Sequence, residues 1–115
     1  MKIYGIKNCD TMKKAMKWLD GKDISYEFHD YKKLGIDEEV FTKAIKTHGW
    51  ENVINRRGTT WRKLPDDIKN NMNDGKSLGL ANENPSIIKR PLLVHNGNII
   101  LGFKDEEYSK IMNIT

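Results

Sequence analysis

The chain has 115 residues, of which 37% are hydrophobic and 31% are charged, as is typical of one domain with a single core. Its 20 basic and 16 acidic residues give a net charge of +4, and the two signs are interleaved, so no basic face indicates a nucleic-acid-binding protein. No apolar run approaches the ~20 residues that cross a bilayer, one cysteine excludes an internal disulfide framework, and one cysteine with three scattered histidines forms no zinc pattern.

The first predicted elements are a strand over residues 2–6 and a helix over residues 10–19. The strand alternates β-type residues and ends beside glycine. The helix is indicated by apolar residues at helical spacing, with Asp10 and Thr11 as its cap region and Gly21 as its C-terminal cap. Cys9, the only cysteine, is therefore expected at or just before a helix N-terminus.

This position favours a reactive thiolate. The unpaired N–H groups and the positive end of the helix dipole favour an anion, and Lys7, Lys13 and Lys14 add positive charge. Such surroundings lower a cysteine pKa from ~8.5 to between ~3.5 and ~7.5. The alternative is that Cys9 is a small buried hydrophobe without chemistry, because free cysteine is among the most buried residue types. A catalytic role for Cys9 would also require partner residues from elsewhere in the chain.

A second strand is predicted at residues 25–29, where polar and aromatic residues alternate. Strand, helix and strand within about thirty residues form a βαβ unit, so the two strands should be parallel. Cys9 then lies at the carboxyl end of a strand, which is the edge where α/β folds usually place their sites.

The middle of the chain has a mostly helical pattern. We expect a turn at 30–35, a helix opened by residues 37–39 and closed at 48–50, and a short segment at 51–54. A loop over 55–62 should present arginines, a helix should start at 63–67 with Ile68 and Met72 inward, residues 73–75 should break it, and a short helix should follow at 77–83.

Two further strands are predicted at 87–95 and 98–102, joined by a turn at Asn96 and Gly97, because Asn-Gly between apolar runs is a strong hairpin signal. A final helix over 105–112, with Tyr108, Ile111 and Met112 inward, completes a ββα unit. A βαβ unit followed by a ββα unit, with a cysteine after the first strand, predicts an α/β protein with a thioredoxin-like mixed sheet.

Four blocks of sequence resemble one known group of proteins and fall in its order. The blocks are residues 4–11 with 13–15, Asp30-Tyr31, residues 55–64 and Lys89-Arg90-Pro91. Together they resemble the ArsC/Spx family of thioredoxin-like proteins, and most closely its YffB-like branch. The resemblance implies a single ArsC-like domain over 1–115, with a thioredoxin-like core at about 1–34 and 86–115 and a helical insert at about 35–85.

The resemblance also implies site residues. The nucleophile of the arsenate reductases matches Cys9, the arginine before the proline matches Arg90, and the mid-chain arginine matches Arg57, which we prefer, or Arg56. A third arginine of those reductases falls where this chain has Phe103, which argues against arsenate reduction.

The presence of a single cysteine limits the thiol chemistry that the chain can perform. Spx proteins commonly carry Cys-x-x-Cys, whereas Met12 stands three positions after Cys9, so a mixed disulfide has to be resolved by an external thiol, most simply glutathione. The YffB-like branch resembles a glutathione-dependent thiol reductase. We therefore expect an enzyme in which the Cys9 thiolate attacks a small disulfide or thiol-reactive substrate.

The remaining site residues have supporting roles in this hypothesis. Arg90 and Arg57 would hold carboxylates of glutathione or substrate, and Pro91 resembles the cis-proline of thioredoxin-like sites. Thr11 and Asn8 would donate hydrogen bonds to the thiolate or cap the helix.

The alternatives are a Spx-like transcription regulator that binds RNA polymerase and an arsenate reductase. We further expect a cytoplasmic monomer that uses no metal and binds neither membrane nor nucleic acid directly, since the N-terminus shows no signal-peptide pattern.

Overall fold

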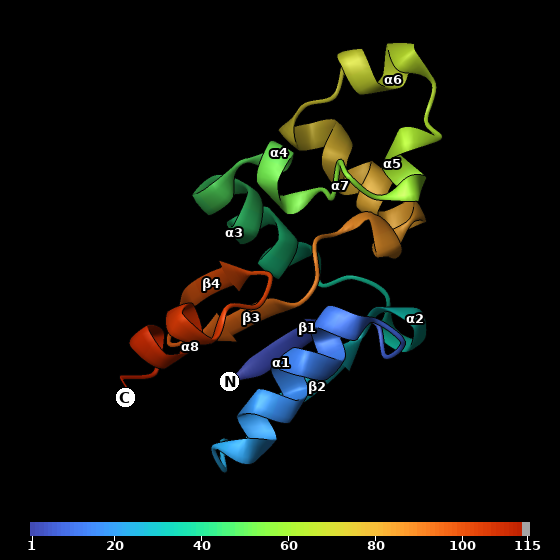
Figure 1. Cartoon of the computed structure of the whole chain (residues 1–115). Coiled ribbons are helices and arrows are strands. Elements are labelled where there is room, and N and C mark those ends of the chain that lie inside the picture. The colour runs from blue at the N-terminus through green and yellow to red at the C-terminus, as the bar shows by residue number, and fades with distance from the viewer. Residues whose placement is uncertain (114–115) are drawn as a thin grey trace. The chain divides into compact units, whose positions relative to one another are not determined.

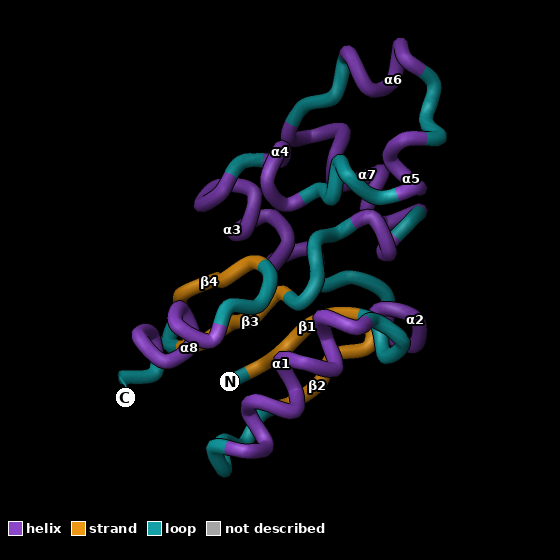
Figure 2. Tube along the Cα trace, viewed as in Figure 1, coloured by secondary structure: helices purple, strands orange, loops and turns teal. Residues whose placement is uncertain are grey.

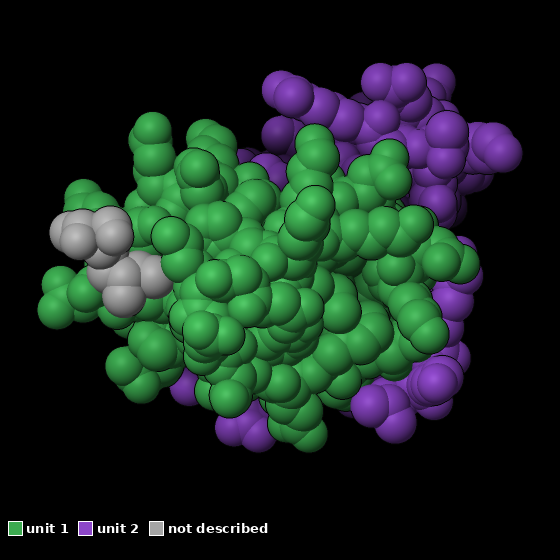
Figure 3. Space-filling model, turned by 60° about the horizontal axis from the view of Figure 1, so that its bottom comes forward, with its two compact units in different colours: residues 1–31, 90–115 green, residues 32–89 purple. Residues whose placement is uncertain are grey.

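The computed structural model describes residues 1–113. The chain forms two compact units (Figure 3). One unit is built from both ends of the chain, residues 1–31 together with the segment that begins at Arg90, and the other comprises residues 32–89. Among the described residues, no helix has the length and apolar character needed to span a membrane.

The first unit contains a four-stranded mixed sheet, drawn in orange in Figure 2. Its strands are β1 (Lys2–Gly5), β2 (Glu27–Asp30), β3 (Leu92–His95) and β4 (Asn98–Leu101). They lie in the order β2-β1-β3-β4, with β1 parallel to β2 and antiparallel to β3, and β3 antiparallel to β4. The predicted parallel pairing and the predicted hairpin are therefore confirmed.

Helices α1 (Asp10–Gly21) and α8 (Asp105–Ile111) cover one face of this sheet (Figure 1). Ile3, Leu93 and Ile100 stand opposite one another on adjacent strands, so their side chains share that face. They form one buried cluster with four helical residues, which are Met12, Ala15, Leu19 and Tyr108. The spacing of the first three on α1 is the helical period that the sequence shows.

The ends of α1 differ from the prediction. Cys9 is the N-cap residue, with extended backbone at φ −127° and ψ 127°, so neither Asp10 nor Thr11 takes that place. Gly21 lies inside the helix and is not its cap, and the chain reverses two residues later, where Asp23 adopts a left-handed φ of 56°. An aspartate tolerates that conformation better than most residues, which is why no glycine is needed there.

The second unit is helical. Its elements are α2 (Tyr31–Leu34, whose first residue belongs to the first unit), α3 (Glu38–His48), α4 (Trp50–Val53), α5 (Thr59–Arg62), α6 (Asp66–Asn70), α7 (Asp74–Glu83) and the 3-10 turn Pro85–Ile87. The Asp37 carboxylate accepts a hydrogen bond from the Val40 amide at 3.2 Å and begins α3. Gly49, at φ 81°, ends it as predicted.

Several predictions for this unit are wrong. Residues 31–34 form a short helix where a turn was expected, and the arginine-bearing loop ends at Gly58 because residues 59–62 form α5. Asn73 does not break a helix but begins α7, since its side chain accepts a hydrogen bond from the Lys76 amide at 2.9 Å. Ile68 does not point inward and is 42% exposed. Met72 is half-buried but lies beyond the end of α6, which has only five residues and buries none of them.

The strand predicted from residue 87 begins only at Leu92. Ile87 lies in the 3-10 turn, and Ile88 forms a single bridge with Ile54. The peptide bond between Arg90 and Pro91 is cis, as expected from the resemblance. At the hairpin, Asn96 and Gly97 both have positive φ, the conformation that a type I′ turn requires.

Candidate functional site

Cys9 lies in the turn between β1 and α1 of the first unit. Its carbonyl oxygen accepts the first intrahelical hydrogen bond, from the Lys13 amide at 3.0 Å. The residue is partly exposed, while its side chain also packs against the hydrophobic cluster under the sheet. The thiol is therefore held by packing on one side and open to solvent on the other.

The close approach of β1 to α1 depends on Gly5. A Cβ atom at this position would overlap the sulfur of Met12, which is fully buried in the first turn of the helix. A glycine at the end of β1 thus allows the helix to begin directly behind the strand. This packing places the Cys9 sulfur in front of the amide groups of the first turn.

Hydrogen bonds and charge around Cys9 stabilise its thiolate. Burial raises the pKa of the Cys9 thiol, but hydrogen bonds from the Met12 amide and the Arg90 side chain, the positive charge of Arg90 and a hydrogen bond from the Thr11 amide lower it by more. The net pKa lies below the ordinary value. Two donors come from the helix N-terminus and one from Arg90, which lies two positions before β3, so the structure brings Cys9 and Arg90 together.

Other predicted residues near the thiol have different positions. Thr11 contributes its backbone amide, and its side chain is half-buried. Asn8 is exposed in the turn before Cys9. Pro91 is fully buried directly after Arg90.

Phe103 occupies an aromatic cluster. Its ring centroid lies 4.8 Å from that of Tyr108 and 6.2 Å from that of Trp18. The Tyr108 hydroxyl donates a hydrogen bond to the Gly102 carbonyl at 3.2 Å, and burial raises the pKa of this tyrosine well above its ordinary range. Position 103 is therefore filled by a ring that joins α1 to α8, and it supplies no positive charge.

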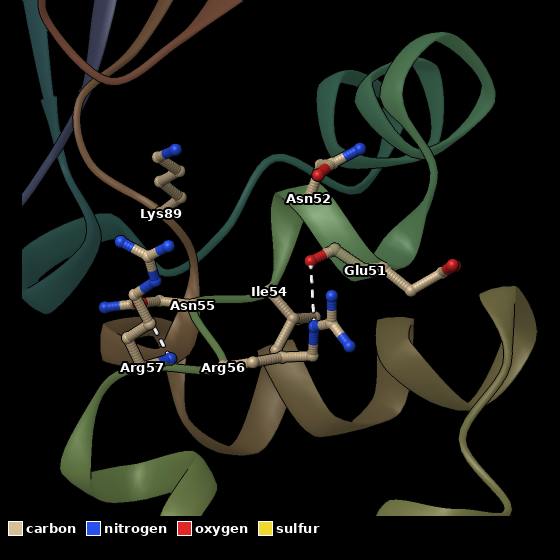
Figure 4. Close-up of a pocket in the computed structure, with 7 residues that line it drawn as sticks. All are labelled: Glu51, Asn52, Ile54, Asn55, Arg56, Arg57 and Lys89. Atoms are coloured by element: carbon tan, nitrogen blue, oxygen red, sulfur yellow. Dashed lines mark hydrogen bonds between the residues drawn. The ribbon is translucent and has the colours of Figure 1, made fainter.

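Arg56 and Arg57 lie in the second unit, where they line a pocket of about 460 Å³ (Figure 4). The complete lining is Glu51, Asn52, Ile54, Asn55, Arg56, Arg57 and Lys89. Three cationic side chains and one carboxylate surround it, so its chemistry suits an anionic group.

The two arginines are held differently. The Nε atom of Arg56 donates a hydrogen bond to the Glu51 carbonyl at 3.2 Å, and its guanidinium lies 5.8 Å from the centroid of the Trp50 ring. Arg57 is fixed through its backbone, because its amide donates a hydrogen bond to Asn55 Oδ1 at 3.2 Å, while its side chain extends toward Lys89 in Figure 4. Contacts with Glu51 and Trp50 therefore hold the Arg56 side chain in place. The Arg57 guanidinium is instead directed into the pocket.

Two lining residues, Asn55 and Lys89, had no predicted role. Both lie in the blocks that carry the family resemblance, and their place in those blocks is the sequence feature that could have identified them as site residues. Asn55 also holds the turn at Gly58, whose amide donates a hydrogen bond to the Asn55 carbonyl at 3.3 Å. Within residues 1–113, no group of three or more histidine, cysteine or acidic side chains is arranged to hold a metal ion.

Comparison with known proteins gives the family. The ArsC family matches residues 4–111. The chain belongs to the ArsC family. A relative from Haemophilus influenzae, named as an uncharacterized protein, is 43% identical over 106 residues, which cover 92% of this chain and 93% of the relative. The resemblance seen in the four sequence blocks is confirmed.

Solved structures of ArsC-family proteins agree with the fold. A structure of a protein named YffB is 47% identical, has a TM-score of 0.91 and covers 95% of this chain and 96% of its own. An arsenate reductase-related protein from Brucella melitensis is also 47% identical, with a TM-score of 0.76 and coverage of 98% and 94%. The predicted thioredoxin-like fold is therefore confirmed.

The chain is also similar to regulators. The global transcriptional regulator Spx of Streptococcus mutans is 26% identical over 102 residues, which cover 87% of this chain and 74% of that protein. The chain thus stands among ArsC-family proteins that are either thiol-oxidoreductase-like or Spx-like regulators.

Proposed function

We propose that this ArsC-family protein is a thiol-disulfide oxidoreductase in which Cys9 is the nucleophile and glutathione is the co-substrate. The supporting observation is the lowered pKa of Cys9, which has two amide donors of the α1 N-terminus and the Arg90 side chain as hydrogen-bond partners. A buried structural cysteine would have its pKa raised, because nothing would compensate for burial.

The reaction has two exchange steps. The Cys9 thiolate attacks one sulfur of a small disulfide, a new sulfur-sulfur bond forms, and the other sulfur leaves with the electron pair as a thiolate. A glutathione thiolate then attacks the substrate sulfur of this mixed disulfide, and the Cys9 thiolate leaves. The leaving step also benefits from the low pKa, because a stable thiolate is a good leaving group.

The arginines would bind carboxylates. In this proposal Arg90 holds a carboxylate of glutathione or of the substrate beside the thiol, next to the buried Pro91. Arg57 binds an anionic group in its own pocket, and Arg56 orders the loop. Thr11 acts through its amide, and Asn8 is a further donor from the exposed turn. The proposed setting is a cytoplasmic monomer without a metal.

The test is the rate at which oxidised glutathione glutathionylates Cys9 near neutral pH, followed by intact mass. Native protein, urea-unfolded protein and the Arg90→Ala variant are compared, and Arg62→Ala serves as a control that removes one exposed arginine. We expect the native rate to exceed the unfolded rate by at least about tenfold, to fall in Arg90→Ala and to stay unchanged in the control. A native rate no higher than the unfolded rate would exclude the proposed enzyme.

A second candidate function is a Spx-like regulator that binds RNA polymerase. It is favoured by the similarity to Spx over 87% of this chain. In this case Cys9 would be incidental or a redox sensor, and Cys9→Ser would retain polymerase binding in a pull-down with purified polymerase. Loss of glutathionylation without loss of polymerase binding would then separate the two functions.

Arsenate reduction is the least favoured alternative. Phe103 fills the place where a third arginine is expected, and its ring packs against Tyr108. We expect no arsenate turnover with glutathione and glutaredoxin.

A further inference from the structure

Strand β2 lies at one end of the sheet, so only one of its two sides is paired within residues 1–113. On the paired side, the Glu27 amide donates a hydrogen bond to the Met1 carbonyl at 3.1 Å. Because backbone groups alternate in direction along an extended chain, the carbonyl of Tyr26 and both backbone groups of Phe28 point away from β1. These groups form an open edge to which another extended chain can add as a further strand.

A groove of about 640 Å³ lies beside this open edge, between β2 and α1. Its apolar lining comes from four half-buried residues that also pack against the hydrophobic cluster under the sheet, which are Met16, Ile24, Tyr26 and Phe28. Tyr26 and Phe28 thus contribute both open backbone groups and aromatic walls. We call these four residues, together with Asp20 and Asp23, the β2-edge groove.

The charged residues that line the β2-edge groove are both carboxylates, Asp20 and Asp23. Neither takes part in an ion pair among the described residues. The Tyr26 hydroxyl donates a hydrogen bond to Asp20, and burial together with this carboxylate raises the pKa of Tyr26. The hydroxyl therefore remains a neutral donor that holds the Asp20 carboxylate beside the groove.

The end of α1 adds to the negative potential of these carboxylates. A helix C-terminus carries a partial negative charge and favours a cation, yet the last turn of α1 contains no basic residue and contains Asp20 instead. The nearby cations lie outside the groove. Lys22 is 5.8 Å from the centroid of the Trp18 ring, and Lys17 projects about 60° around the helix from Asp20. The groove therefore combines apolar walls with a negative end.

Three features select the class of occupant. The open backbone groups select an extended polypeptide, because such a chain repeats donors and acceptors at the period of the strand. The apolar walls select an apolar side chain, and the two carboxylates select a cationic one and repel a nucleic acid. Antiparallel pairing is slightly more stable than parallel pairing, and it places the C-terminal end of the added segment beside Asp20 and Asp23.

We propose that the β2-edge groove binds an extended segment of a partner protein, with an apolar side chain in the groove followed by basic residues opposite Asp20 and Asp23. This inference does not depend on the proposed thiol chemistry. Asp20 lies on α1, whose N-cap is Cys9, and the separation along the helix axis is about 16 Å. The rate of Cys9 glutathionylation is therefore measured in parallel and should be the same in every variant below.

The experiment uses short capped peptides without cysteine, in which threonine and valine alternate and two arginines follow. One comparison peptide has glutamines in place of the arginines. Another keeps the arginines but has N-methylated backbone amides, so it cannot pair as a strand. Calorimetric titration gives the dissociation constant of each peptide, and hydrogen exchange followed by NMR gives the exchange rate of the Phe28 amide.

We expect the arginine peptide to bind about tenfold more tightly than the glutamine peptide at low salt, and the N-methylated peptide not to bind. Saturation with the arginine peptide should slow exchange of the Phe28 amide by at least about tenfold, because that amide becomes hydrogen-bonded. Exchange at the exposed Gly75 of the second unit should not change.

The variant that combines Asp20→Asn with Asp23→Asn should abolish the preference for arginine. Asparagine keeps the shape of both side chains and tolerates the left-handed φ of 56° at position 23. The matched control, Glu39→Gln with Glu106→Gln, removes the same charge from exposed positions outside the groove and should retain the preference.

Four results would overturn the proposal. They are equal affinity for the arginine and glutamine peptides, absence of binding by the arginine peptide, binding of the N-methylated peptide with equal affinity, and equal loss of the preference in both double variants. Slower exchange at Phe28 with rising protein concentration and no peptide would show that a second copy of the chain fills the edge instead. The rate of Cys9 glutathionylation tests the proposed function separately from all of these.

Discussion

The Arg90 side chain, which directly precedes the cis-bonded Pro91, hydrogen-bonds the sulfur of Cys9 at the N-terminus of α1. Two residues far apart in sequence thereby meet where β1 ends and β3 begins, because these two strands are paired antiparallel. The contact places a permanent positive charge beside a group whose reactivity depends on being negative.

The first prediction concerns Arg90→Ala. We expect the pKa of Cys9 to rise, because both the hydrogen bond and the charge of Arg90 lower it in the native protein. Alkylation by iodoacetamide as a function of pH, followed by intact mass, measures that pKa. The thiolate fraction at a fixed neutral pH should fall accordingly. An unchanged alkylation profile would show that Arg90 does not stabilise the thiolate.

The second prediction concerns stability and pH. The folded-state pKa of Cys9 is lowered, so its thiolate contributes stability that is fully present above the unfolded pKa and is lost as pH falls through the folded pKa. The difference in the free energy of unfolding between the native protein and Cys9→Ser should therefore grow as pH rises between these two pKa values. Urea denaturation at a series of pH values measures it, and a difference independent of pH would contradict the prediction.

The third prediction compares two glycines. Gly5→Ala should destabilise the fold by about 1–3 kcal/mol, because the added Cβ would overlap the buried Met12 side chain. Gly21→Ala should be neutral or stabilising by up to about 1 kcal/mol, because Gly21 lies in α1 with no atom within 4 Å of an added Cβ. Thermal or urea unfolding of both variants checks the pair, and equal effects would refute the packing argument.

The parallel pairing of β1 with β2 and the hairpin of β3 and β4 were predictable because alternation, Asn96-Gly97 and helical periodicity all act over short distances in the sequence. The position of Cys9 at a helix N-terminus followed for the same reason. The short helices of the second unit were less predictable, since elements of four or five residues contain too little periodicity to distinguish an inward face. Ile68 illustrates this, because an apolar residue at helical spacing proved to be exposed.

The candidate site was likewise predictable only in part from the sequence. Cys9 is singled out by its local sequence, whereas Arg90 becomes its partner only through the pairing of β1 with β3, which no local pattern specifies. The sequence resemblance supplied that link. It could not separate Arg56 from Arg57, because the distinction depends on contacts of Arg56 with Glu51 and Trp50.

The fourth prediction uses these contacts to separate the two arginines. Arg57→Ala should weaken the binding of an anionic ligand such as glutathione by about tenfold without changing stability, because its side chain extends into the pocket. Arg56→Ala should instead lower the free energy of unfolding by about 1 kcal/mol, since it loses a hydrogen bond and a cation–π contact. Calorimetric titration and urea denaturation measure the two quantities. Equal behaviour of both variants would contradict the assignment.

The first unit is assembled from both ends of the chain, with the whole second unit lying between them in sequence. During synthesis Cys9 is added well before Arg90 and the strand that aligns it, because the whole second unit lies between them in the sequence. An incomplete chain therefore carries the cysteine without the guanidinium that lowers its pKa. The lowered pKa of the thiol is therefore reached only after Arg90 has been added and β3 has paired with β1.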